Sequence, residues 1–142
     1  MRLVLDTATM VAAIRSNSGA SNRLLRAALE RRLTMLVSTS LLIEYEAVMT
    51  RAEHVEASGL AVEEVSAVLD AVAAVAEPVR LAFHWRPALR DPDDDMVLEA
   101  AANGQAEAIV TFNKRDFAAV SERFGVEVLS PGEALRKLEI GR

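Results

Sequence analysis

The sequence contains no cysteine, so the protein has neither disulfide bonds nor thiolate metal sites. It contains no P-loop, no G-x-S-x-G and no G-x-G-x-x-G, so the common nucleotide-binding and serine-hydrolase signatures are absent. Its two histidines do not form an H-x-x-x-H pair. The six glycines and four prolines are too few and too dispersed to suggest a low-complexity region. These classes of chemistry are therefore poorly supported by the sequence.

Long hydrophobic runs are also missing. The apolar stretch at residues 71–76 is too short to span a bilayer and is interrupted by Glu77 and Pro78. The apolar run near the N-terminus is followed directly by Asp6 and is too short for the hydrophobic region of a signal peptide, so we expect no signal peptide. With 142 residues, of which 51% are hydrophobic, the chain can bury one core. We expect one cytoplasmic domain over residues 1–142, without membrane contact.

The net charge of −5 argues against binding to duplex DNA. Basic residues nevertheless cluster locally, and such clusters are consistent with a small RNA-binding site. The alternative for each of them is a solvated helix face. The clusters are Arg23, Arg26, Arg31 and Arg32; Arg86 and Arg90; and Lys114 and Arg115.

Apolar runs and helix-spaced segments alternate along the chain, a pattern typical of a parallel sheet covered on both faces. The pattern predicts an α/β protein, a three-layer α/β/α sandwich with a central parallel sheet. Ser21 and Ser40 are the expected N-caps of the first two helices. We expect strands at residues 3–5, 35–37, 79–83, 108–111 and 126–129, and helices at residues 21–32, from 40 onward, 62–76, from 94 or 95 to 103, 116–124 and 131–138.

Residues in four places, most of them acidic, stand out from the chain's other Asp and Glu residues, and three of the places lie at or just after a predicted strand. Open α/β sheets bind ligands at the carboxyl ends of their strands, so residues distant in sequence can meet there. Carboxylates in one crevice repel each other unless a cation lies among them. This arrangement predicts a divalent-metal site. The four places are Asp6, Glu44, residues 91–95, and Asn113 with Asp116.

The first two places have structural alternatives. Asp6 ends a buried strand and could instead cap a helix or form a turn, and Thr7 could donate its hydroxyl to the carboxylate or to a water. Glu44 could simply complement a helix dipole, but Leu41, Leu42 and Tyr45 turn its side of the helix towards the sheet.

The last two places are less clear in detail. Asp93 reads as a solvent-facing turn residue. Asp94 is favoured over Asp95 as the inward-pointing acid, although either could cap the following helix. Asn113 could supply a carbonyl oxygen and Asp116 a charge, or Asp116 could be an ordinary N-cap.

The order and wording of these segments resemble the PIN-domain ribonucleases, especially the VapC-like toxins of bacterial toxin–antitoxin pairs. The likeness extends from Met1 to about Ala134. Two departures are Asn113, where many members carry aspartate, and Ala8, where asparagine or serine is common. The matching segments are residues 4–7, 38–45, 90–95 and 109–117.

The resemblance implies a nuclease that hydrolyses RNA phosphodiester bonds with Mg²⁺, or Mn²⁺ as a substitute. It implies that Asp6, Glu44, Asp94 and Asp116 bind metal and that Asn113 completes the site. A cognate antitoxin would neutralise the toxin. The apolar helix at residues 62–76 suggests a homodimer, although burial within the monomer explains it equally well.

Two other functions remain open at this point. A PIN-like fold retained only for binding RNA or protein would be consistent with Asn113 and Ala8. A phosphoacceptor or phosphohydrolase domain would need a nucleophilic aspartate, often in a D-x-D arrangement, but residues 6–8 offer a single carboxylate.

Overall fold

A central parallel sheet organises the chain in a computed structural model that describes residues 1–82 and 92–141. The strand order is β3-β2-β1-β4-β5, and every neighbouring pair is parallel. This confirms the predicted α/β/α architecture. The strands are β1 (Arg2–Leu5), β2 (Thr34–Val37), β3 (Glu77–Pro78), β4 (Ala108–Val110) and β5 (Glu127–Leu129).

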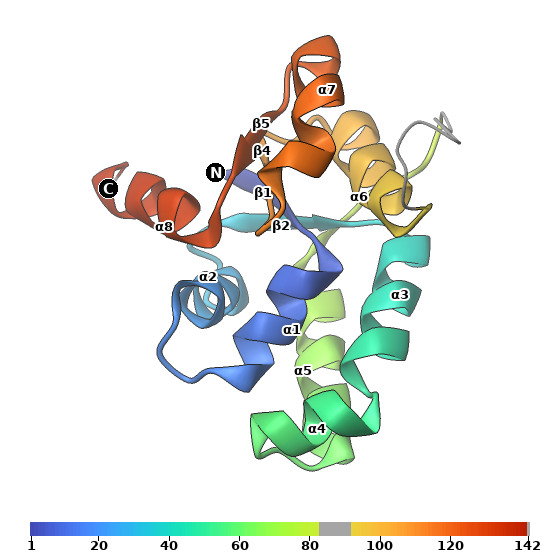
Figure 1. Cartoon of the computed structure of the whole chain (residues 1–142), viewed down its shortest axis with the longest axis vertical. Helices are drawn as coiled ribbons and strands as arrows, with labels where there is room; N and C mark the ends of the chain where they lie inside the picture. Colours follow the sequence, from blue (N-terminus) through green and yellow to red (C-terminus); the bar gives the residue numbers. More distant parts are fainter. Residues whose placement is uncertain (83–91, 142) are drawn as a thin grey trace.

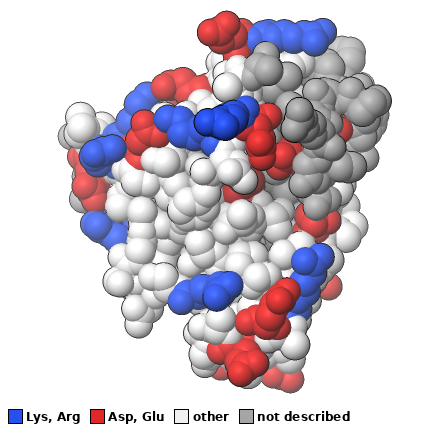
Figure 2. Space-filling model, in the orientation of Figure 1, with Lys and Arg blue, Asp and Glu red and all other residues white. Residues whose placement is uncertain are grey.

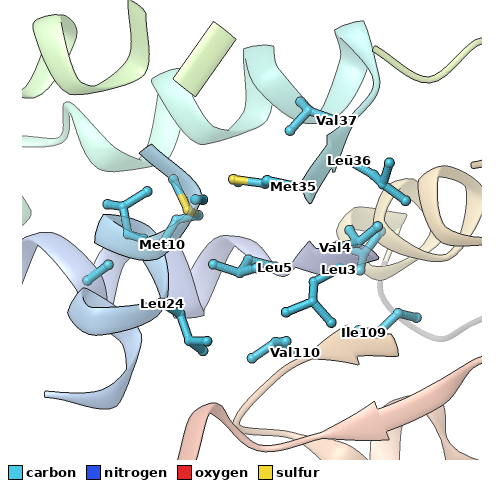
Figure 3. Close-up of a cluster of buried hydrophobic side chains, with 14 of the residues drawn as sticks. Leu3, Val4, Leu5, Met10, Leu24, Met35, Leu36, Val37, Ile109 and Val110 are labelled. Atoms are coloured by element: carbon cyan, nitrogen blue, oxygen red, sulfur yellow. The ribbon is translucent and has the colours of Figure 1, made fainter. Parts of the chain in front are cut away.

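The middle strand, β1, is buried on both faces. Leu3, Val4 and Leu5 have no exposed surface, and Figure 3 shows them between side chains of β2 and β4. A parallel strand covered on both faces needs an unbroken apolar run, and this is the run that the sequence provides. The polar residue that follows β1 is therefore placed at the edge of the core.

Helices cover both faces of the sheet. In Figure 1, α6 and α7 lie on one side and α1, α2 and α5 on the other. The helices are α1 (Thr7–Arg15), α2 (Ala20–Leu29), α3 (Thr39–Met49), α4 (Ala52–Ser58), α5 (Val62–Val75), α6 (Pro92–Asn103), α7 (Lys114–Phe124) and α8 (Pro131–Ile140).

Two helices were not predicted. Helix α1 starts directly after β1, where a turn was expected, because Asp6 caps it and its apolar side chains enter the core. Helix α4 contains no buried residue, so it lacks the apolar stripe that reveals a helix in a sequence. In both cases the local sequence pattern was too weak to predict the helix.

The third strand lies earlier than predicted. Residues 79–83 were expected to form it, but β3 is the two-residue segment Glu77–Pro78, paired with Leu36 and Val37. Proline cannot donate a ladder hydrogen bond, so it is tolerated only at an edge strand. Residues 79–82 are not in a strand, and residue 83 lies outside the described chain.

Helix caps also differ in detail. Gly19 and not Ser21 caps α2, and Ser21 is buried inside that helix. Ser38 and not Ser40 caps α3, accepting a hydrogen bond from the Leu41 amide at 3.2 Å. The final helix was predicted correctly, with Pro131 in its first turn.

Candidate metal site and its cavity

The sheet changes direction at β1, and the site lies there. Strand β1 has β2 on one side and β4 on the other, so the connections leave it in opposite directions and open a crevice at the carboxyl ends. Leu5 is in register with Val110, and the Asp6 amide donates to the Val110 carbonyl at 3.0 Å. The ends of β1 and β4 therefore lie side by side, as predicted for a ligand site.

Asp6 is only 7% exposed, yet its carboxylate is held by neutral donors. Oδ1 accepts from the Thr9 amide at 2.8 Å, and Oδ2 accepts from the Thr111 hydroxyl at 2.5 Å. Asp6 is thus the N-cap of α1, which was the structural alternative, and it faces the crevice as well. Among the described residues, Asp6 has no ion pair, so its negative charge is oriented but not neutralised.

The hydroxyl that orients Asp6 was not the expected one. Thr7 was predicted to hold the carboxylate, but its Oγ1 is buried and has no hydrogen-bond partner in the described part of the chain. Thr111, at the end of β4, does so instead, and its Oγ1 accepts the Asn113 amide at 3.0 Å. A threonine directly after a second buried strand was the available signal for this role.

Tyr45 fixes the helix that carries Glu44. Its side chain is fully buried, and its hydroxyl donates to the Leu5 carbonyl at 2.5 Å. Burial, and then the negative charge of Asp6, raises the pKa of Tyr45 well above its ordinary value. Glu44, one residue earlier, is half-buried at the same crevice.

One cavity of about 360 Å³ brings together all five residues predicted for the site. They come from the ends of β1 and β4 and from helices α3, α6 and α7, which are far apart in sequence. Within the described chain, no three acidic or histidine side chains converge closely enough to form a preformed metal cluster. The five residues that line the cavity are Asp6, Glu44, Asp94, Asn113 and Asp116.

The two candidate acids of α6 differ in position. Asp94 lines the cavity and is half-buried, whereas Asp95 is 2% exposed and does not line it. Neither caps the helix, because α6 begins at Pro92. Asp93 belongs to the first turn of α6 and not to a turn before it, and Asp91 lies outside the described residues.

The fourth place is more open. Asn113 and Asp116 are exposed, and Asn113, not Asp116, is the N-cap of α7. Two cavity residues, Arg51 and His54, were not predicted for the site. His54 could not be found from sequence because it lacks a metal-ligand spacing. A larger cavity of about 580 Å³, between α1, α2 and α5, contains none of the acids.

The donor set fits a hard divalent cation. All of the candidate ligands are carboxylate or amide oxygens, which Mg²⁺ and Mn²⁺ prefer. The Asp6 carboxylate is already oriented by two hydrogen bonds and has no cationic partner among the described residues. A cation in the cavity would relieve the repulsion among these acids.

The family model for the PIN domain matches residues 2–115. The chain belongs to the PIN-domain family. No curated protein matches the sequence. The crystal structure of VapBC2 from Rickettsia felis, bound to a DNA fragment from its promoter, is similar with a TM-score of 0.61. That match covers 92% of this PIN domain and 98% of the other chain at 17% identity, so it shows the shared fold.

The PIN family is generally a family of nucleases. Its members typically use divalent metals, in agreement with the oxygen donors of the cavity. Across the described residues of this PIN domain, no helix is both long and apolar enough to cross a membrane.

Proposed function

We propose that this PIN domain is an endoribonuclease that depends on Mg²⁺ or Mn²⁺. The observation that carries the proposal is the single cavity at the switch point of the sheet, where five oxygen-bearing side chains from five elements meet. Asp6 and Asp94 would hold the main ion, and Asp116 and Asn113 would complete the site. Bound there, the cation would supply charge stabilisation at the phosphate that is cut.

The protein's own residues have separate tasks in this proposal. Thr111 and the Thr9 amide keep the Asp6 carboxylate in one orientation, so little reorganisation is needed when the ion binds. Tyr45 anchors α3, and Glu44 would orient the attacking water by accepting its hydrogen bond. The expected products carry a 5′-phosphate and a 3′-hydroxyl.

The biological setting is part of the proposal. The VapBC2 structure of Rickettsia felis is a similar fold from a toxin–antitoxin complex, and this supports a toxin role with a cognate antitoxin as partner. An antitoxin arginine inserted among the carboxylates would neutralise them. We also propose a cytoplasmic location and one domain over residues 1–142.

A homodimer remains a prediction on weaker ground. The apolar face of α5 that suggested it is used inside the chain, where Val65, Leu69 and Val72 are buried. The apolar residues of α5 left exposed for contact with a second copy are Val62, Ala67, Ala73 and Ala74.

The test is cleavage of single-stranded RNA with Mg²⁺, with Mn²⁺ and with EDTA, by the wild type and by Asp6→Asn. We expect cleavage only with a divalent ion and at least about a hundredfold loss in the variant, because an oriented ligand of the ion is lost. Asp70→Asn, which removes an exposed acid of α5, is the matched control. Equal rates for Asp6→Asn and the wild type would overturn the site assignment.

A binding module without catalysis is the second candidate. Two observations favour it: Asn113 stands where many relatives carry an acid, and the described acids do not form a preformed cluster. Calorimetry separates the two. RNA or partner binding without any Mg²⁺ or Mn²⁺ uptake would support the binding module.

A further inference from the structure

The site cavity has a basic end. Glu44, Val48 and Arg51 line the same wall, followed by His54 of α4. Glu44 and Val48 are four residues apart and lie on one face of α3, while Arg51 lies two residues beyond the end of that helix and is the N-cap of α4.

Arg51 was not among the basic residues predicted to bind RNA, but among the described residues it is the arginine that lines the site cavity. Lys114 forms an ion pair with Glu133 at 2.8 Å, and Arg23 forms one with Glu139 at 2.9 Å. Arg51 is exposed, and within the described chain its guanidinium has neither an ion pair nor a hydrogen bond. It remains unpaired even though it shares a cavity with several carboxylates.

His54 contributes to the wall in another way. Its Nδ1 is buried and has no partner among the described residues, and its Nε2 lies 3.8 Å from Glu53 Oε1. Because solvent does not reach Nδ1, a ligand phosphate does not reach it either. Arg51 is the exposed, permanently charged group at this end of the cavity.

We propose that Arg51 binds a backbone phosphate next to the one that is cut, so that the RNA strand runs along α3 from Glu44 to Arg51. This inference rests on the proposed nuclease function and assigns its substrate path. A guanidinium presents paired N–H donors that match a phosphate, and its charge attracts the strand. Arg51 lies beyond the end of α3 and lines the same cavity as the carboxylates, so it would meet a phosphate next to the one held there.

Figure 2 agrees with such a path. On the face shown, basic side chains lie above and below a group of acidic side chains near the centre, and further acidic side chains lie at the upper and lower edges. An RNA strand crossing this face would meet positive charge on both sides of the acids.

The test compares Arg51→Gln, Arg51→Lys and the wild type, with Arg136→Gln as the control for loss of an exposed arginine of α8. Binding of a short labelled single-stranded RNA is followed by anisotropy in Ca²⁺, and cleavage is followed in Mn²⁺, both over a range of salt concentrations. We expect Arg51→Gln to weaken binding about tenfold and to raise KM with little change in kcat.

Salt dependence identifies the contact. Loss of one phosphate contact should make the slope of log K against log salt shallower by about 0.7. Arg51→Lys should keep the slope, because its charge remains, while Arg136→Gln should behave as the wild type. Arg51→Gln with wild-type affinity, KM and salt slope would overturn the inference.

The two proposals fail in different ways. If the wild type cleaves RNA and Arg51→Gln binds as well as it does, only the Arg51 inference is wrong. If the wild type binds RNA through Arg51 but does not cleave it with either Mg²⁺ or Mn²⁺, only the nuclease function is wrong. A wild type that does not bind RNA at all overturns both. Thermal melts of each variant should match, since Arg51 is exposed.

Discussion

The two ends of strand β1 treat charge in opposite ways. At the amino end, Arg2 forms a bidentate ion pair with Glu77 at 2.6 and 3.0 Å and also donates to the Gly104 carbonyl. At the carboxyl end, Asp6 is more deeply buried but is held only by the neutral donors Thr9 and Thr111. Among the described residues, Arg2 is therefore paired with an anion, whereas Asp6 is not paired with a cation.

The two charges also differ in what they contribute to the stability of the fold. An ion pair at the surface neutralises both partners and adds little to stability. An oriented carboxylate without a cation costs free energy through desolvation and repulsion, and such a cost is typical of a binding site. The contrast therefore supports the proposal that the Asp6 charge serves a ligand, without reference to any relative.

The sharpest extension of this comparison lies on α6, where two adjacent acids differ. Asp94→Asn should reduce RNA cleavage about a hundredfold or more with little change in stability, because Asp94 lines the cavity. Asp95→Asn should do the reverse and cost about 1–3 kcal/mol, because Asp95 is only 2% exposed and does not line the cavity. Urea unfolding and RNA cleavage, measured on both variants, give the answer.

If Asp95→Asn abolished cleavage while Asp94→Asn did not, the third acid of the site would be Asp95. The choice between Asp94 and Asp95, which the sequence leaves open, would then fall on the residue that does not line the cavity.

Removing the neutral donor at the carboxyl end should affect stability and activity together. Thr111→Val leaves Asp6 Oδ2 without its hydrogen bond, which should cost about 1–3 kcal/mol. Cleavage should fall roughly tenfold or more, as for other groups that orient a metal ligand. Thr111→Ser keeps the hydroxyl and is the control. A full-rate Thr111→Val enzyme would show that the orientation of Asp6 does not matter.

Tyr45 offers a smaller effect with a direct optical signal. Tyr45→Phe removes the hydrogen bond to Leu5 and should cost about 1 kcal/mol at neutral pH. The folded pKa of Tyr45 is raised, so its contribution is complete below the ordinary tyrosine pKa of about 10 and is lost as the pH rises above it.

Tyr45 is the only tyrosine, so tyrosinate absorbance reports its titration alone. In the folded protein the tyrosinate absorbance should rise at a higher pH than in urea. The Tyr45→Phe variant should lack the loss of stability at alkaline pH. Coincident titrations in the folded and unfolded states would contradict the burial of this hydroxyl.

The amino end of β1 should give the smallest effect. Arg2→Gln and Glu77→Gln each break an ion pair whose side chains are 37% and 45% exposed, so stability should fall slightly and salt should remove the difference. Hydrogen bonding to Arg2 lowers the pKa of Glu77, so its contribution is present above the ordinary carboxyl pKa and is lost on acidification. Cleavage should be unchanged in both, as measured beside a thermal melt.

The sequence alone determined the class of the fold and the strand ends that matter. The unbroken apolar run of β1 predicted a doubly covered parallel strand, and Asp6 after it predicted a ligand site, because both depend on neighbours in sequence. The order of the acids also carried the likeness to PIN domains, which the family model confirmed.

Tertiary structure decided what depends on partners distant in sequence. Only the pairing of β1 with β4 brings Thr111 to Asp6, and only the packing of α6 separates Asp94 at the cavity from Asp95 in the core. The position of Arg51 in the same cavity as these acids is a further example. Such contacts join residues about fifty to a hundred positions apart, and no local pattern encodes them.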